Sequence, residues 1–224
     1  MILDLMIWAP IISGLIILMM GKNYGSLSYS LSIFSSSLVF VISLYALSMY
    51  DSSQTGIQFE LITSWIERFD INYHLGVDGI SFPLILLTTF ITPIVLLTSR
   101  TSEKPNLHQY LASFLILEGL MIGVFSALDA FLFYVFWEAM LIPMFIIIGI
   151  WGGKNRVYAT IKFFLYTFLG SVFMLIAIIY LYIQTGSYSI FDFYNIDLSR
   201  TEQILIFLAF LFAFAVKIPM WPVH

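Results

Sequence analysis

The chain has 224 residues, of which 61% are hydrophobic and 10% are charged, and its formal net charge is −4. Soluble domains carry about 25% charged residues, so this composition excludes an ordinary soluble domain and gives no indication of nucleic-acid binding. The absence of cysteine excludes disulfides, iron–sulfur clusters and thiolate metal sites on this chain, and the three histidines, all near segment ends, argue against a haem-binding bundle.

Apolar runs long enough to cross a hydrocarbon core of about 30 Å recur along nearly the whole length. They predict about seven transmembrane helices, because a helix satisfies its own backbone hydrogen bonds in lipid. The first run carries Asp4 where a secretory signal would carry a basic residue, so we expect a retained span. The sequence therefore predicts an all-α polytopic membrane protein, with residues 1–224 forming a single transmembrane domain. The predicted spans are Ile2–Met20, Leu27–Met49, Ile80–Thr98, Leu111–Leu128, Ala130–Trp151, Val157–Ile183 and Ile204–Met220.

The basic residues between the predicted spans favour one orientation. Cytoplasmic loops of membrane proteins are enriched in Lys and Arg. If the N-terminus lies outside, the inner loops hold five basic residues and the outer loops hold two, so this orientation is expected. The inner residues are Lys22, Arg100, Lys104, Lys154 and Arg156, and the outer residues are Arg68 and Arg200.

The longest outer loop, residues 51–79, contains a strand-like pattern. Apolar and polar residues alternate at period two from Phe69 to Asp78, as they do in a half-buried strand. The preceding Ile57–Ile66 stretch can pair with this segment as a small β-hairpin. Such a hairpin could dock a neighbouring subunit or cover the outer helix ends, and both interpretations stay open.

Four ionisable residues lie well inside the predicted spans: Glu118, Glu138, Lys162 and Lys217. A charge at the bilayer centre costs about 2.5–3.5 kcal/mol, so such residues usually face a bundle interior and have a function. At a rise of about 1.5 Å per residue, Glu118 and Glu138 fall near the midplane and Lys217 lies somewhat inside the centre. Lys162 lies about one turn from the inner end of its span, where a lysine can reach the interface, so a functional and a structural role both stay open.

Prolines place Glu138 and Lys217 beside broken helices. Pro143 follows Glu138 by five residues and removes the hydrogen bond to the Ala139 carbonyl. A helix broken near Lys217 would present its negative C-terminal end to the ammonium, and such breaks occur at membrane depth where they line a cavity or water path. The prolines after Lys217 are Pro219 and Pro222, which are expected to leave the carbonyls of Ala215 and Ile218 without partners.

Glu138 and Lys217 together suggest a proton-transfer element. Desolvation disfavours both charged forms, and pairing favours both. A site in which these effects nearly cancel can be switched by moving one partner: separation favours release of a proton from the lysine, and return recharges it. The alternative is a fixed structural ion pair.

Three segments carry motifs that match a known family: F-L-F-Y-V-F-W-E-A-M-L-I-P-M (131–144), A-T-I-K-F-F-L-Y-T (159–167) and F-A-V-K-I-P-M-W-P-V-H (214–224). They closely resemble the antiporter-like membrane subunits of respiratory complex I, the NADH–quinone oxidoreductase. Within that family the likeness is greatest to the branch called chain M, or subunit 4 in mitochondria. The W-E-x-x-L-I-P and A-F-x-x-K-x-P-x-x-P-x-H strings are specific together, and the likeness covers the whole chain.

The resemblance implies roles for four residues. Glu138 matches a span-five glutamate that pairs with the pump lysine, and Lys217 matches that lysine on a discontinuous seventh span. Lys162 matches a basic residue on span six. His224 falls where the family has a histidine leading into its next span, as a possible step of the proton relay. Glu118 has no dependable counterpart, so its part in a relay is a prediction from its position alone.

The resemblance also implies a function. A family member would translocate protons in the membrane arm of NADH:quinone oxidoreductase, beside other membrane-arm subunits and lipid, in a bacterial or mitochondrial inner membrane. This chain has no G-x-G-x-x-G after a strand and no cluster ligand, so no redox chemistry, cofactor or metal is expected on it. NADH, FMN, iron–sulfur clusters and quinone are expected in partner subunits.

The length of the chain leaves further interpretations open. Family members are about twice as long and consist of two inverted halves, so this chain resembles the first half and is expected to be a truncated gene, one piece of a split gene or a fragment. One alternative function is a subunit of a multisubunit sodium/proton antiporter or of a membrane-bound hydrogenase. Another is a truncated structural or assembly fragment that does not transport ions.

Overall fold

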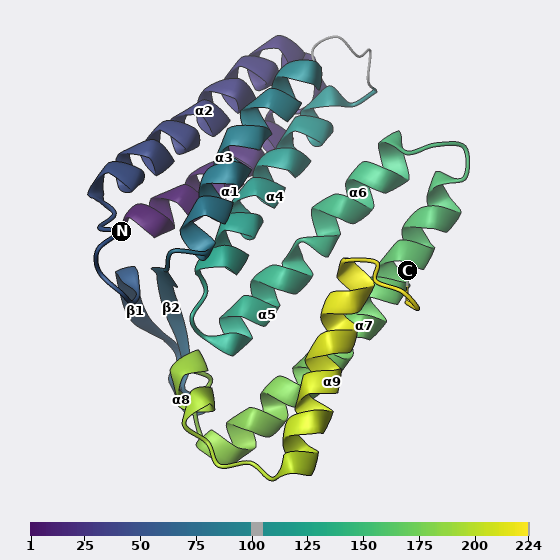
Figure 1. Ribbon diagram of the computed structural model, residues 1–224. Helices are drawn as coiled ribbons and strands as arrows, with labels where there is room; N and C mark the ends of the chain where they lie inside the picture. The colour runs from purple at the N-terminus through teal and green to yellow at the C-terminus, as the bar shows by residue number, and fades with distance from the viewer. Residues whose placement is uncertain (100–104, 224) are drawn as a thin grey trace.

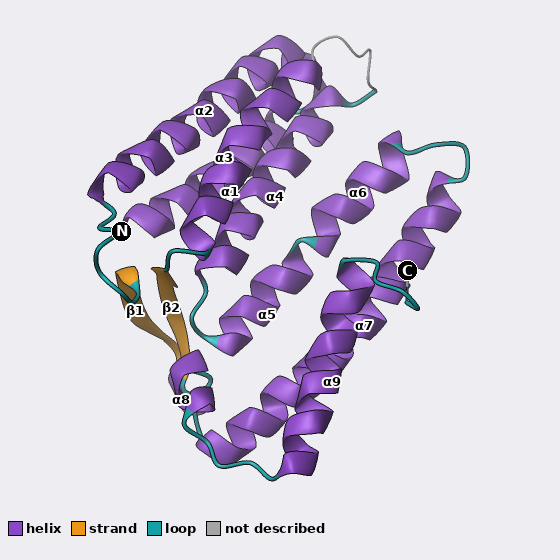
Figure 2. Cartoon of the chain, in the orientation of Figure 1, coloured by secondary structure: helices purple, strands orange, loops and turns teal. Residues whose placement is uncertain are grey.

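The computed structural model describes residues 1–99 and 105–223, and its architecture is helical with one small sheet (Figures 1 and 2). The described residues contain six helical segments that are long and apolar enough to cross a membrane, which confirms an all-α polytopic membrane protein. The helices are α1 (Ile2–Met20), α2 (Gly25–Met49), α3 (Ser81–Thr98), α4 (Leu107–Ser126), α5 (Ala130–Ala139), α6 (Leu141–Trp151), α7 (Arg156–Thr185), α8 (Ile190–Tyr194) and α9 (Arg200–Lys217). A 3-10 turn (Lys22–Tyr24) joins α1 to α2, and α5 with α6 forms one span.

The seventh predicted span differs from the structure at both ends. α9 begins at Arg200 and not at Ile204, because Ser199 caps it: the Ser199 side chain accepts from the Glu202 N–H, and the Glu202 carboxylate accepts from the Ser199 N–H. The helix ends at Lys217, just before Pro219. α9 is 18 residues long and carries three charged side chains, so its composition does not mark it as a membrane span.

The first four helices form a bundle in which α1 packs along α4 (Figure 1). Gly119 on α4 allows this approach: a Cβ at this position would lie 2.3 Å from the Ile7 carbonyl oxygen, so only glycine fits. A pair of hydroxyl groups joins α1 to α2, where the side-chain oxygens of Ser13 and Ser35 lie 2.6 Å apart. Small and polar interface residues of this kind let membrane helices pack closely without exposing polar groups to lipid.

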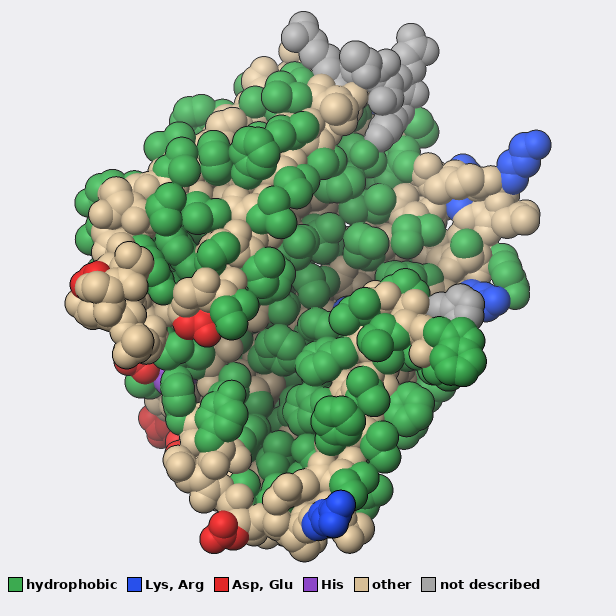
Figure 3. Space-filling view, viewed as in Figure 1, with side chains coloured by type: hydrophobic (Ala, Val, Ile, Leu, Met, Phe, Trp, Pro, Cys, Tyr) green, Lys and Arg blue, Asp and Glu red, His purple; other side chains and the backbone are tan. Residues whose placement is uncertain are grey.

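The later helices form a second group, in which α6 packs on α7 and α7 packs on α9. Gly170 on α7 faces Val216 on α9, where a Cβ would come within 3.0 Å of the valine side chain. The space-filling view shows a hollow lined by hydrophobic side chains between the first bundle and α9 (Figure 3). One groove in this region has a volume of about 510 Å³ and is lined by residues of α5, α7, α8 and α9.

The predicted hairpin is present as the antiparallel strands β1 (Gln58–Ile66) and β2 (Ile71–Val77). β2 lies against the connection between α4 and α5, where the Leu128 N–H donates to the His74 carbonyl at 2.9 Å. β1 leaves Ile62 and Trp65 exposed. The hairpin therefore covers one end of the helices through β2, and docking of a neighbouring subunit on β1 stays a prediction.

Loops predicted to share one side of the membrane lie at the same end of the molecule. At the end opposite the hairpin, the Trp151 indole N–H donates to the Pro105 carbonyl at 2.8 Å and joins the α3–α4 connection to the end of α6. At the hairpin end, the Ala130 N–H donates to the Tyr188 carbonyl at 2.8 Å. The predicted inner residues Arg100 and Lys104 lie outside the described residues.

Candidate functional site

The fifth span is broken directly after Glu138. α5 ends at Ala139, α6 begins at Leu141, and the two are joined by a turn at Met140, visible as a short loop between the two helices (Figure 2). Pro143 has no N–H, so the Ala139 carbonyl has no helical donor. The break confirms the interruption that the proline predicts, and it opens the backbone beside an acidic side chain.

Lys217, the last residue of α9, reaches this break. Its ammonium nitrogen lies 3.3 Å from the Trp137 carbonyl oxygen and donates to it. The same nitrogen lies 4.3 Å from the centre of the Trp137 ring, in cation–π geometry. A carbonyl at the end of a broken helix carries part of the negative end of the helix dipole, so it is a suitable acceptor for a cation. Lys217 therefore connects α9 to the broken span.

The backbone around Lys217 differs in one respect from the prediction. Pro219 was expected to leave the Ala215 carbonyl without a partner, and this is wrong because the Met220 N–H donates to it at 2.9 Å. The chain turns after Lys217 and closes a longer hydrogen-bonded loop than a helix would. The loop keeps the end of α9 in place while the lysine side chain points to the broken span.

Glu138 is half-buried and faces α7. The Ser171 hydroxyl on α7 lies near the Glu138 carboxyl group and the Tyr134 hydroxyl, and it donates to the Phe168 carbonyl. Its Oε1 atom is buried without a hydrogen-bond partner in the protein. Glu138 and Lys217 lie near each other, yet the salt bridges among the described residues do not include this pair. Lys217 therefore lies near Glu138 but is hydrogen-bonded to the Trp137 carbonyl.

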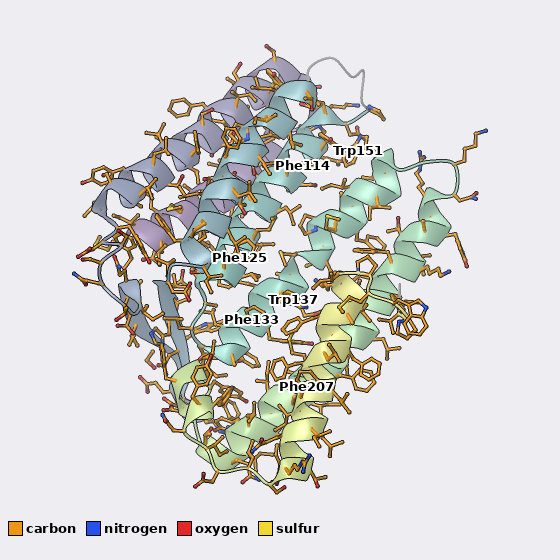
Figure 4. The ribbon with its side chains drawn as sticks, viewed as in Figure 1. Phe114, Phe125, Phe133, Trp137, Trp151 and Phe207 are labelled. Atoms are coloured by element: carbon orange, nitrogen blue, oxygen red, sulfur yellow. The ribbon has the colours of Figure 1, made fainter. Side chains whose placement is uncertain are left out.

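The Trp137 ring next to the ammonium packs with other aromatic rings, and Figure 4 shows Trp137 and Phe133 on α5. The Trp137 ring lies 5.5 Å from Phe133 and 5.6 Å from Phe214, measured between ring centres. The Trp137 indole N–H is buried without a hydrogen-bond partner in the protein. Lys217 therefore sits at the edge of an apolar layer, where its attraction to a carbonyl and a ring is strengthened by the low dielectric.

The other predicted site residues lie elsewhere. Glu118 is on α4, is 1% exposed and faces α3. Lys162 lies on an exposed face of α7, with its ammonium nitrogen 5.9 Å from the Tyr158 ring centre and about 13 Å along the helix from Ser171. His224 lies outside the described residues. The structure thus brings Glu138 and Lys217 together, and it does not bring Glu118 or Lys162 to them.

Three residues near the site were missed by the sequence prediction. Trp137 and Ser171 look like ordinary span residues, and only helix packing brings Trp137 into contact with Lys217 and Ser171 near Glu138. Asp129 could have been found, since an Asp before an apolar run is a typical helix cap. Its carboxylate accepts from the Phe131 and Leu132 N–H groups at 2.9 Å, which caps α5.

Asp129 also ties the hairpin to the fifth span. Its second oxygen accepts from the Asn72 N–H of β2 at 3.1 Å. Burial raises the pKa of the Asp129 carboxyl, and its hydrogen bonds and the nearby His74 oppose this rise. The residue thus holds the starting point of the span that carries Glu138.

Among the described residues, no group of three His, Asp or Glu side chains lies together as metal ligands would.

Two family descriptions match the chain and together cover nearly all of it. The family described as NADH-ubiquinone oxidoreductase chain 4, amino terminus, matches residues 5–126, which is more than half of the chain. The family described as NADH:quinone oxidoreductase/Mrp antiporter, TM, matches residues 127–224. The boundary falls directly after α4.

Curated relatives carry matching names. NADH-quinone oxidoreductase subunit M of Rhodobacter capsulatus is 49% identical over 200 residues, which is 84% of this chain and 38% of that protein. NADH-ubiquinone oxidoreductase chain 4 of Marchantia polymorpha is 40% identical over 220 residues, which is 98% of this chain and 44% of that protein. The chain thus spans less than half the length of these relatives.

Two solved structures contain chains with the same fold as this one. A chain of respiratory complex I from Thermus thermophilus with bound NADH matches the whole chain with a TM-score of 0.87 and 26% identity, over 45% of its own length. A chain of the membrane-bound sulfane sulfur reductase, an archaeal respiratory membrane complex, matches with a TM-score of 0.80 and 24% identity over 35% of its length, which shows the fold alone. By its sequence and its fold, this chain belongs to the chain 4, or subunit M, family of NADH–quinone oxidoreductase membrane proteins.

Proposed function

We propose that the chain is a proton-translocating membrane-arm subunit of an NADH:quinone oxidoreductase, and that it forms the first half of the antiporter-like unit. The observation that carries this proposal is the contact of the Lys217 ammonium with the Trp137 carbonyl, one residue before Glu138 at the break of the fifth span. Ionisable groups at a broken helix inside a membrane mark ion pathways. The printed names of the relatives support the same complex.

The proposed mechanism uses two groups that attract each other without a direct salt bridge. Lys217 is charged while the Trp137 carbonyl, the Trp137 ring and the nearby Glu138 charge stabilise its ammonium. A small movement of α9 relative to α5 removes this stabilisation in a site of low dielectric, and the lysine then releases its proton. Return of α9 restores the charged form. A fixed ion pair would lack this freedom, because both partners would be held by each other.

Ser171 offers a path for the proton on the other side of Glu138. Its hydroxyl donates to the Phe168 carbonyl at 2.9 Å, so its oxygen keeps lone pairs for other donors. A protonated Glu138 or the Tyr134 hydroxyl can donate to that oxygen. We assign Ser171 and Tyr134 the role of accepting and passing the proton between Glu138 and water.

In this proposal the redox chemistry belongs to partner subunits. NADH, FMN, iron–sulfur clusters and quinone would be held by other subunits, and this chain would carry no redox chemistry. Electron transfer there would reach this chain as a conformational or electrostatic change through neighbouring membrane-arm subunits. We place the chain in a bacterial or mitochondrial inner membrane with its N-terminus outside. In this arrangement the hairpin and Glu202 lie outside, and Lys154 lies inside.

A second candidate is a subunit of a multisubunit sodium/proton antiporter. The description of the family that matches residues 127–224 includes Mrp antiporters, and this half contains both Glu138 and Lys217. The match of residues 5–126 to the chain 4 amino terminus favours the oxidoreductase. Dependence of transport on sodium in the assembled complex, without NADH oxidation, would favour the antiporter.

The Lys217→Ala variant tests the proposed function in the assembled complex. Proton pumping and NADH oxidation are measured together in inverted membrane vesicles. We expect fewer protons pumped per electron, because the group that releases and regains the proton is absent. Glu138→Gln should act in the same direction, and Glu138→Asp should be milder because it keeps the charge. Lys154→Ala, in an exposed turn, is the matched control. An unchanged proton-to-electron ratio in Lys217→Ala would overturn the assignment.

A further inference from the structure

A cavity of about 240 Å³ lies between α3 and α4, away from the broken span. Ten of its eleven lining residues are apolar side chains or threonines, and the other is Glu118. A water needs about 15 Å³ of such space and also polar partners, which among the described residues only the Glu118 carboxyl group and the two threonine hydroxyls offer here. Its lining residues are Leu84, Leu87, Thr88, Ile91, Thr92, Val95, Phe114, Leu117, Glu118, Met121 and Phe125.

Glu118 lies in the wall of this cavity without a partner in the protein. Its residue is 1% exposed, and both carboxyl oxygens are buried without a protein hydrogen bond. An ionised carboxylate in such a place costs several kcal/mol unless a cation or hydrogen-bond donors compensate it. No Lys, Arg or His is among the described residues that line the cavity.

The two threonines can accept hydrogen bonds but cannot compensate a negative charge. The Thr88 hydroxyl donates to the Leu84 carbonyl, and the Thr92 hydroxyl donates to the Thr88 carbonyl, both at 2.9 Å. Their hydrogens are therefore engaged, and their oxygens keep lone pairs that can accept further hydrogen bonds. A neutral carboxylic acid fits these surroundings, because its O–H needs an acceptor.

We propose that the cavity between α3 and α4 is a second proton-binding site, in which Glu118 holds a proton and exchanges it through water with the Thr88 and Thr92 hydroxyls as acceptors. Its ligands are protons and water, and a sodium ion is excluded by the apolar lining and the small number of oxygens. Among the described residues Glu118 forms no salt bridge, and neither Glu138 nor Lys217 lines the cavity, so the site is separate from theirs. It therefore does not depend on the proposed pump assignment.

Infrared difference spectroscopy of the assembled complex in lipid tests this site. We compare wild type with Glu118→Gln, which keeps the shape of the side chain and removes the acid. The expected difference is the loss of one carbonyl band of a protonated carboxylic acid at neutral pH. In D₂O the wild-type band should move to lower frequency, because water reaches the cavity and exchanges the proton. Glu67→Gln, at the exposed turn of the hairpin, is the matched control and should leave that band unchanged.

Thr92→Val provides a second variant that keeps the acid. It should leave the band in place and shift its frequency, because one acceptor of the acid O–H is removed. The unfolding temperature of Glu118→Gln should stay near that of wild type, since a neutral amide replaces a neutral acid. If no protonated-acid band is lost in Glu118→Gln, or if the band does not respond to D₂O, the proposal is wrong. Proton pumping of the Lys217→Ala variant is independent of both outcomes, so failure here leaves the proposed function intact.

Discussion

At Trp137, a backbone carbonyl that an unbroken helix would give to the Leu141 N–H is used to hold a lysine from another helix. The contact depends on one residue of the span losing its helical partner and on α9 ending beside it. The indole ring adds a second attraction from 4.3 Å. The carbonyl and the ring that hold Lys217 therefore belong to a tryptophan that the sequence does not distinguish from an ordinary span residue.

Replacement of Trp137 by leucine tests the contribution of the ring. The variant keeps the backbone carbonyl and removes the cation–π attraction, which is worth about 2 kcal/mol when desolvated. We expect proton pumping per electron to fall several-fold, while Trp137→Phe, which keeps an aromatic face, should lose less. Trp151→Leu removes an indole at the end of α6 that lies away from the site and serves as the control. Wild-type pumping in Trp137→Leu would show that the ring does not stabilise the ammonium.

Asp78 allows a test of stability against pH outside the membrane. Its carboxylate accepts from the Ser81 and Ile80 N–H groups at 2.7 and 3.0 Å, and these bonds, the Ser81 bond first, lower the pKa of the carboxyl. A lowered pKa contributes stability above the unfolded pKa of about 3.9, and this stability is lost as pH falls through the folded pKa.

We therefore expect Asp78→Ala to lower the free energy of unfolding by about 1 kcal/mol at neutral pH, as the loss of a helix cap does. The difference from wild type should shrink below about pH 4. Thermal unfolding in detergent, from neutral pH to below about pH 4, measures this difference in the free energy of unfolding. Asp197→Ala, in an exposed loop, is the control. A difference that stays constant down to pH 2 would mean that the charge of Asp78 does not contribute.

At the scale of elements, the broken fifth span is held from its starting end by the hairpin. Asp129 accepts from β2 and from the first turn of α5, and the α7–α8 connection pairs with the same segment. A displacement of the hairpin therefore moves the beginning of the helix that carries Glu138. This link connects the surface of the molecule to the candidate site through hydrogen bonds of the backbone.

Asp129→Ala should loosen this junction. The substitution removes the cap of α5 and leaves the Asn72 N–H without its acceptor, a loss of about 2 kcal/mol. We expect faster hydrogen–deuterium exchange in β2 and in the first turn of α5, and a smaller effect in Asp129→Asn, which keeps one acceptor. Asp192→Ala in α8 is the control. Unchanged exchange in β2 would show that the junction does not hold the hairpin.

At the scale of the whole molecule, charged side chains gather at the two ends and hydrophobic ones cover the surface between them (Figure 3). The acidic groups lie mainly around the hairpin, and the α6–α7 turn carries basic ones. A membrane protein with this distribution can cross a bilayer in either direction by hydrophobicity alone, so the basic loops decide the orientation.

Cysteine labelling tests the orientation, and the chain has no cysteine to interfere. We expect Lys154→Cys to react with a membrane-impermeant maleimide only from the inner side, and Gln54→Cys only from the outer side. Both positions are exposed in the folded chain. The reverse pattern would place the N-terminus inside and refute the assignment from the basic loops.

Much of the fold could be predicted from the sequence, because long apolar runs and period-two alternation are local patterns. The spans from Ile2 to Met20 and from Ala130 to Trp151 have the predicted bounds, and the hairpin pairs as expected. The bounds of α9 were predicted less well, since the Ser199 cap lies before the apolar run and adds a polar first turn. The apolar run marks where a helix is buried in lipid, whereas caps decide where it begins.

The sequence by itself determined that this is a helical membrane protein with a break after Glu138 and a lysine before Pro219. It also identified the family, because each of the two motifs that contain these residues is one short continuous segment and can be recognised without knowledge of the fold. Only the tertiary structure decided that Lys217 donates to Trp137 and not to Glu138, that Ser171 lies near Glu138, and that Glu118 faces a separate cavity. The reason is that these contacts depend on how helices distant in sequence are rotated against one another, and a hydrophobic pattern inside a lipid-embedded bundle specifies that rotation poorly.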